Sequence, residues 1–253
     1  MYVEVVDYDK LSKDQRGVFD KVIERINDNK VIRMFVSGTA GTGKSFLIRA
    51  LIDALGSEHV FICAPTGLAA KLVNGKTIHS FFNMPIVVQV GECFLKLIII
   101  DEISMCSASM LDKIEEKLSS TRPNNGPFGG YSVIMFGDLL QIPPVEAKWV
   151  FESKWWHLFE YAELLTNHRQ HQDCEFADML MRWRVGRLSS SDIKFLETRV
   201  IKSLKPLKTD KIADAFINIE KGNSMILVHT NWMADEINKK VGFFLFSIAK
   251  LFL

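Results

Sequence analysis

The sequence contains few of the residues that mark a secreted or metal-bound protein. Its 253 residues include four cysteines, and no two of them form a C-x-x-C pair. Neither a disulfide framework nor a zinc site is therefore expected, and a reducing compartment fits. The formal net charge is +1, so the whole molecule has little attraction for nucleic acid, and any contact with DNA must come from a local surface.

Export signals and membrane-length apolar runs are also missing. The N-terminus lacks a basic start followed by an apolar core, so we expect no secretory signal and an intracellular protein. Residues 242–253 are strongly apolar, but Lys250 interrupts them. They also fall short of the ~20 residues that a membrane span requires. We expect this ending to be a buried strand or helix, or a chain that diverges partway through a domain.

Apolar runs alternate with helical patterns along most of the chain. Apolar residues three and four positions apart predict helices at 12–27, 45–55, 66–73, 108–118, 174–185 and 232–240. Runs typical of buried strands lie at 34–36, 60–64, 97–100, 133–136 and 225–228. Because buried strands that alternate with helices form parallel sheets covered on both faces, the pattern predicts an α/β fold.

A glycine-rich segment between the first predicted strand and the following helix matches the whole G-x-x-x-x-G-K-[ST] pattern. Its residues are Gly38, Thr39, Ala40, Gly41, Thr42, Gly43, Lys44 and Ser45. Glycines let backbone N–H groups close around phosphates, and the following helix presents the positive end of its dipole to them. Lys44 is predicted to reach the β- and γ-phosphates, and the Ser45 hydroxyl to bind Mg²⁺. The segment predicts a P-loop NTPase; a strand-to-helix turn without a ligand is the alternative.

Polar residues also follow two later predicted strands, 97–100 and 133–136. Asp101 and Glu102 come directly after 97–100, and ligands of parallel sheets gather at the carboxyl ends of strands. We expect Asp101 to hold Mg²⁺ and Glu102 to polarise the attacking water, or else the pair to be acids at a helix start. Gln141 follows 133–136 and is expected to touch the γ-phosphate or its water; a solvated turn residue is the alternative.

Five segments in this order resemble the motifs of the Pif-type DNA helicases of superfamily one. They are GTAGTGKS, APTGLAAKLVNGKTIHSFF, IIIDEISM, FGDLLQIPPV and LTNHRQ. The resemblance covers about residues 11–169, and a weaker similarity continues through 225–231. It implies a RecA-like first lobe over 1–165 and an incomplete second RecA-like lobe, with an apolar tail, over 166–253.

The resemblance also implies roles at the nucleotide. In the family the residue that matches Gln15 contacts the adenine, which implies ATP. Locally, Ser12 to Gln15 also fits a capping box, so capping of its own helix is the alternative for Gln15. Arg169 aligns with the family's motif-four arginine, which reaches the γ-phosphate.

Three residues are implied to contact DNA. Thr66 follows the strand at 60–64 and opens a helix, where it and nearby N–H groups can take a DNA phosphate. His79 and Phe81 match the family's strand-tracking segment, in which polar groups meet the backbone and an aromatic ring stacks on a base. Ordinary core packing is the alternative for Phe81, and a satisfied hydrogen bond for His79.

The activity that the resemblance implies is an ATP-dependent DNA helicase in genome maintenance, with ATP and Mg²⁺ as cofactors. The partner would be single-stranded or junction DNA, the direction five-prime to three-prime, and the compartment the nucleus or the mitochondrion. We expect a monomer without membrane contact. The family's later second-lobe motifs find no match before Leu253, so we expect ATP binding with weak turnover. A non-catalytic nucleotide-dependent binding module and a P-loop ATPase with a non-nucleic-acid client are the alternatives.

Overall fold

The computed structural model describes residues 7–83, 95–168, 173–200, 208–219 and 225–249. The chain divides into two compact units, 1–187 and 188–253. Each is described by itself. The lobe boundary predicted after residue 165 falls inside the first unit, because the segment that follows is tied to the sheet by bonds given below.

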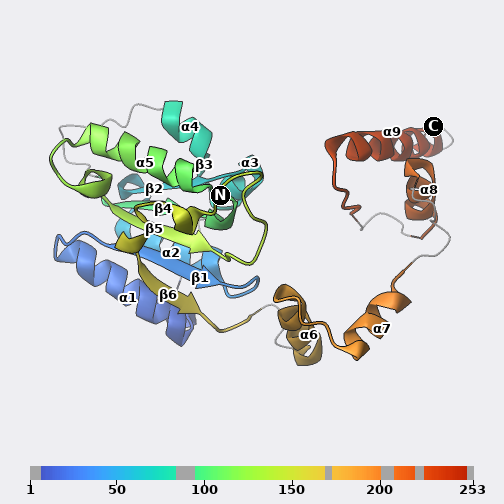
Figure 1. Ribbon diagram of the computed structural model, residues 1–253, viewed down its shortest axis with the longest axis horizontal. Helices are drawn as coiled ribbons and strands as arrows, with labels where there is room; N and C mark the ends of the chain where they lie inside the picture. The colour runs from blue at the N-terminus through green and yellow to red at the C-terminus, as the bar shows by residue number, and fades with distance from the viewer. Residues whose placement is uncertain (1–6, 84–94, 169–172, 201–207, 220–224, 250–253) are drawn as a thin grey trace. The chain divides into compact units, whose positions relative to one another are not determined.

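Six parallel strands form the sheet of the first unit (Figure 1), which confirms the predicted α/β fold. They are β1 (Arg33–Gly38), β2 (Val60–Ala64), β3 (Lys76–Thr77), β4 (Leu97–Ile100), β5 (Ser132–Gly137) and β6 (Glu160–Leu164). Their order across the sheet is β3-β2-β4-β5-β1-β6. Because all strands run in one direction, the loops that follow them lie along one border, here called the carboxyl edge. The residues that precede β1, β4 and β5 form the opposite border, the amino edge.

Helices cover both faces of this sheet (Figure 1). They are α1 (Lys13–Asn27), α2 (Lys44–Leu55), α3 (Gly67–Leu72), α4 (Ile78–Asn83) and α5 (Ala108–Thr121). A further helix, α6 (Cys174–Arg184), follows β6 and lies off these two faces (Figure 1). Successive strand residues point to opposite faces, so β1 sends Met34 and Val36 into the core beneath α1 and α2. Phe35, between them, joins the core beneath α4 and α5. Both cores are almost fully buried, which holds the strand ends of the carboxyl edge in place.

The second unit contains three helices among its described residues: α7 (Ser190–Thr198), α8 (Thr209–Ile219) and α9 (Asn231–Ala249). The predicted helix at 232–240 is confirmed, and it continues through the apolar tail to Ala249. The strand predicted at 225–228 is wrong: Met225 and Leu227 are more than four-fifths exposed and have no regular structure. The described part of this unit supplies no neighbouring strand to pair with their backbone groups.

A search of the helices in the described part of the chain finds none with both the length and the apolar content of a membrane span.

Candidate nucleotide site at the carboxyl edge

The glycine-rich segment connects β1 to α2, as its pattern predicts. Gly41 and Gly43 have φ values of +89° and +76°, a left-handed conformation that glycine adopts without strain. The loop is closed by its own side chains. The Thr42 hydroxyl donates to the Thr39 carbonyl at 2.9 Å, and Lys44 Nζ donates to the carbonyls of Gly38 at 2.6 Å and Thr39 at 3.1 Å. Lys44 is thus held on the loop at the first turn of α2.

Gln15 joins the start of α1 to this loop. Its Oε1 accepts the N–H of Ser12 at 2.9 Å, and the Ser12 hydroxyl accepts the Gln15 N–H, so the capping box is present. Its Nε2 donates to the carbonyls of Thr42 at 2.9 Å and Gly43 at 3.4 Å. A Cβ at Gly43 would collide with that Nε2. Gln15 is 1% exposed, so its bonds fix the loop from the protein side; the adenine contact stays a prediction.

The segment after β6 is held against the same loop. Asp14 accepts the N–H groups of Leu165 at 2.6 Å and Thr166 at 3.0 Å. Burial raises the pKa of Asp14, but hydrogen bonds from Ser12, Thr166 and Leu165 outweigh it and lower the pKa to about 2. Two residues farther on, the His168 N–H donates to the Gly41 carbonyl at 2.8 Å. Arg169 itself lies outside the described residues.

The two predicted carboxylates stand at the end of β4. Asp101 is 5% exposed, and its N–H donates to the Cys63 carbonyl of the neighbouring strand at 2.9 Å. Burial raises the pKa of Asp101 to about 6, while the Glu102 N–H, donating at 2.9 Å, and the charge of Lys44 act in the opposite direction. The fold therefore brings the first and third motif segments close enough for the charge of Lys44 to act on Asp101.

Glu102 has an unusual backbone conformation. Its φ of +52° and ψ of 45° lie in the left-handed region, which few residues other than glycine occupy. Such a residue costs roughly 1–3 kcal/mol and persists where the surrounding structure enforces it. Strain of this kind clusters at functional sites, and here it sets the direction of the half-buried Glu102 side chain beside Asp101.

Ser45 and Asp101 are the residues predicted to hold Mg²⁺. Ser45 is exposed in the first turn of α2. Asp101 directly follows β4, which is separated from β1 in the sheet by β5. Both supply oxygen atoms, the donor that Mg²⁺ prefers, and Mg²⁺ at a phosphate site usually takes only one or two protein ligands. The donor set therefore fits a magnesium ion that completes its coordination with phosphate and water.

The tip of β5 carries a contact that the sequence did not predict. Asp138 is 1% exposed and receives two bonds from Arg184, from Nη2 at 2.6 Å and from Nε at 3.0 Å. Gln141 Nε2 also donates to Asp138, at 3.3 Å. No local pattern links Arg184 to a residue 46 positions away. The one available signal was Asp138 itself, since a carboxylate at the end of a wholly apolar strand needs a buried partner.

The three predicted DNA contacts are placed differently from one another. The Thr66 hydroxyl caps α3 by accepting the Ala69 N–H at 3.2 Å, and His79 is exposed on α4. Phe81 is 2% exposed and packs against Phe61, with ring centroids 5.3 Å apart. A ring buried in this way has no face to offer to a base, so we correct the predicted stacking role of Phe81 to core packing.

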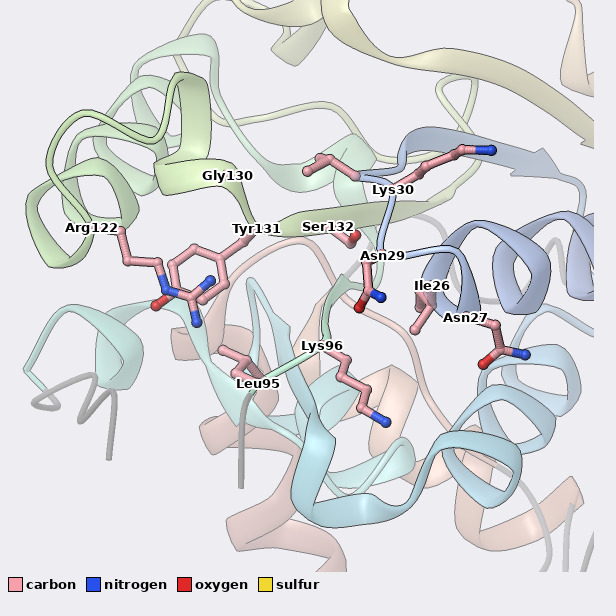
Figure 2. Close-up of a pocket in the computed structure, with 11 residues that line it drawn as sticks. Ile26, Asn27, Asn29, Lys30, Leu95, Lys96, Arg122, Gly130, Tyr131 and Ser132 are labelled. Carbon is pink, nitrogen blue, oxygen red and sulfur yellow. The ribbon is translucent and has the colours of Figure 1, made fainter. Parts of the chain in front are cut away.

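A separate pocket of about 450 Å³ opens at the amino edge (Figure 2). Its lining includes Asn29, Lys30, Lys96 and Arg122, and it contains none of the predicted site residues. Figure 2 shows Arg122 lying beside Tyr131, and the guanidinium carbon is 4.1 Å from the centre of that ring. This pocket thus lies on the opposite border of the sheet from the phosphate loop.

Known sequences match over most of the chain. A family model described as PIF1-like helicase matches residues 10–194. The chain is 34% identical over 233 residues to the ATP-dependent DNA helicase PIF1 of Saccharomyces cerevisiae, covering 81% of this chain and 26% of that protein. It is 34% identical over 201 residues to the Danio rerio protein of the same name, covering 71% of this chain and 30% of that one. The chain therefore spans less than a third of the length of these relatives.

Solved structures give the same match in three dimensions. The Pif1 helicase from Candida albicans superposes with a TM-score of 0.66 at 28% identity, over 90% of this chain and 59% of that one. The Bacteroides Pif1 helicase in complex with ADP-AlF3 and ssDNA also gives a TM-score of 0.66, at 27% identity, over 92% and 57% of the two chains.

Proposed function

The chain belongs to the PIF1-like helicase family, and on that premise we propose that it forms the first lobe and part of the second lobe of an ATP-dependent DNA helicase. ATP and Mg²⁺ bind at the carboxyl edge, and hydrolysis moves the protein along single-stranded DNA, five-prime to three-prime, to unwind duplex. One observation carries this proposal: the neighbouring strands β4, β5 and β1 end in the carboxylate pair, Gln141 and the phosphate loop, respectively.

Each residue of the site has a proposed task. The N–H groups of the phosphate loop and Lys44 hold the phosphates, and Ser45 and Asp101 bind the magnesium ion. Glu102 orients and polarises the attacking water, and Gln141 contacts that water or the γ-phosphate. In this scheme positioning and charge stabilisation supply most of the rate, as is general for phosphoryl transfer. Gln15 and Arg169 stay assigned to the adenine and to the γ-phosphate.

DNA is proposed to pass over the ends of β2 and β3. Thr66 lies at the first of these ends and the exposed His79 at the second. The Bacteroides Pif1 helicase was solved in complex with single-stranded DNA, which supports DNA as the partner here. We further propose that residues 166–253 form part of the second lobe, and that the protein works in the nucleus or the mitochondrion.

The test has two stages. Calorimetry with magnesium and a slowly cleaved ATP analogue should register binding by the folded chain. Phosphate release from ATP should then be measurable, should rise with single-stranded DNA, and should disappear in Glu102→Gln. Glu116→Gln, on the exposed side of α5, is the matched control and should release phosphate at the unchanged rate.

Each result has a defined meaning. Absence of binding heat in well-folded protein would overturn the proposal. Binding without turnover would favour a nucleotide-dependent binding module instead. Turnover that a neutral polymer stimulates as well as DNA does, across a salt series, would indicate another client, since phosphate contacts weaken steeply with salt.

A further inference from the structure

The ion pair between Arg184 and Asp138 is a built contact that the proposed site does not yet use. Arg184 is the last residue of α6, and two of its nitrogens bond to the two oxygens of the carboxylate. This fork geometry is the strong, directional form of an arginine–carboxylate contact. Asp138 is 1% exposed and the Arg184 side chain 24% exposed, so water competes weakly for the bonds.

Fold stability alone is a poor explanation for this pair. Removing two charges from water costs free energy, and buried ion pairs replaced by apolar residues often leave a protein equally stable. Burial raises the pKa of Asp138, yet the bonds from Arg184, Leu140 and Gln141 outweigh it and keep the pKa below its usual value. Asp138 therefore stays ionised, and both of its oxygens act only as acceptors.

The ionised carboxylate fixes which end of the Gln141 amide faces the protein. A carboxylate only accepts hydrogen bonds, so the Gln141 amide must turn its nitrogen toward Asp138. The backbone adds to this hold, because the Gln141 N–H donates to the Asp138 carbonyl at 2.9 Å and the Leu140 N–H donates to Oδ1 at 3.1 Å. With its nitrogen engaged in this way, the carbonyl oxygen is the end of the amide that can accept a hydrogen bond from an attacking water.

We propose that Arg184 is a positioning residue for ATP hydrolysis, which acts through Asp138 to set the orientation of Gln141. This inference rests on the proposed function, and it makes the end of α6 part of the hydrolytic apparatus. Two residues of β6, Glu163 and Tyr161, also raise the pKa of Arg184, but each has a smaller effect than Asp138.

The experiment compares single and double variants in the chain as it stands. Arg184→Met should lower the rate of phosphate release roughly 10- to 100-fold, the loss typical of a misplaced catalytic group, with nucleotide affinity changed less than twofold. Gln141→Ala should lower the rate by a similar factor. If Arg184 acts through Gln141, the double variant should be no slower than Gln141→Ala alone. Arg187→Met, an exposed arginine just beyond α6, is the matched control and should keep the full rate.

Two further measurements separate positioning from folding. Arg184→Lys keeps the charge but lacks the fork, and should recover folding without recovering the rate. Side-chain amide signals of Gln141 in nuclear magnetic resonance should lose their protection from exchange in both Arg184 variants, a readout that does not depend on turnover. Multiplicative rate losses in the double variant, or an unchanged amide signal, would overturn the inference. A wild-type chain that binds no ATP would instead defeat the proposed function.

Discussion

The two edges of the sheet differ in what they offer a ligand. The amino edge holds an open pocket of about 450 Å³ lined by basic and amide side chains (Figure 2). The carboxyl edge holds loop backbone, Lys44 and two carboxylates, and the side chains of Gln15, Lys44, Asp101 and Gln141 each bond to another residue of the edge. Lys30, by contrast, pairs with Asp28, a neighbour in sequence.

This contrast is why the proposed nucleotide site is placed by its prearranged bonds and not by the volume of a pocket. At the carboxyl edge Gln15, Asp14 and Asp138 each hold a loop in one geometry. Binding or catalysis by groups that are already in place avoids the cost of ordering them. At the amino edge the described lining shows no comparable network. We therefore expect variants at the two edges to differ sharply, and the predictions below test that expectation.

Lys44→Ala should have the largest effect. The variant loses the ammonium that is held beside the loop carbonyls and acts on Asp101. Phosphate release should fall at least ~100-fold, as expected when a main charge-stabilising donor is removed. Lys113→Ala, an exposed lysine of α5, is the control and should not differ from wild type. A Lys44→Ala protein with normal turnover would refute the assignment of the carboxyl edge.

Much of this edge could be predicted from local sequence. The complete phosphate-loop pattern placed Gly38 to Ser45 between β1 and α2, and an apolar run ending in Asp101 and Glu102 placed that pair on the neighbouring sheet tip. These signals are local because strand, turn and helix propensities act over a few residues. The same signals failed at 225–228, where a strand depends on a distant pairing partner.

The rest depends on contacts between distant residues. Phe81 carries the same apolar signal whether it faces DNA or the core, and only packing against Phe61 decides the matter. Arg184 lies in an ordinary amphipathic helix, and no spacing rule connects it to Asp138. The capping box of Ser12 and Gln15 was predictable, but the reach of the Gln15 amide to Thr42 was not, because it requires the fold of the intervening strand.

Gln15→Ala should have the next largest effect. The substitution removes three bonds and leaves the carbonyl of Thr42 without its buried donor. The free energy of unfolding should fall by about 2 kcal/mol, measured by urea denaturation. Lys13→Ala, exposed in the same turn, controls for helix propensity. An unchanged stability would show that the loop does not need the tie to α1, and would narrow the difference between the edges.

Low pH should weaken the hydrogen bonds by which Asp14 holds Leu165 and Thr166. The pKa of Asp14 is lowered from 3.8 to about 2 in the fold, so its ionised form stabilises the protein above about pH 4. Because water screens this partly exposed carboxylate, the contribution is roughly 1 kcal/mol, and it is lost as the pH falls from about 4 toward about 2. The difference in unfolding free energy between wild type and Asp14→Asn should shrink over this interval in urea titrations.

Asp178→Asn, on the exposed side of α6, is the control for this prediction. A difference independent of pH would mean that Asp14 holds Leu165 and Thr166 by shape alone.

Lys96→Ala at the amino edge should have the smallest effect. Lys96 is exposed where the pocket opens (Figure 2), and removing an exposed side chain usually changes stability by less than about 0.5 kcal/mol. Phosphate release and binding of the ATP analogue should stay within twofold of wild type. A large loss of either would show that the amino edge communicates with the phosphate loop through the sheet. The contrast between the edges would then fail, because both ends of β4 would serve one reaction.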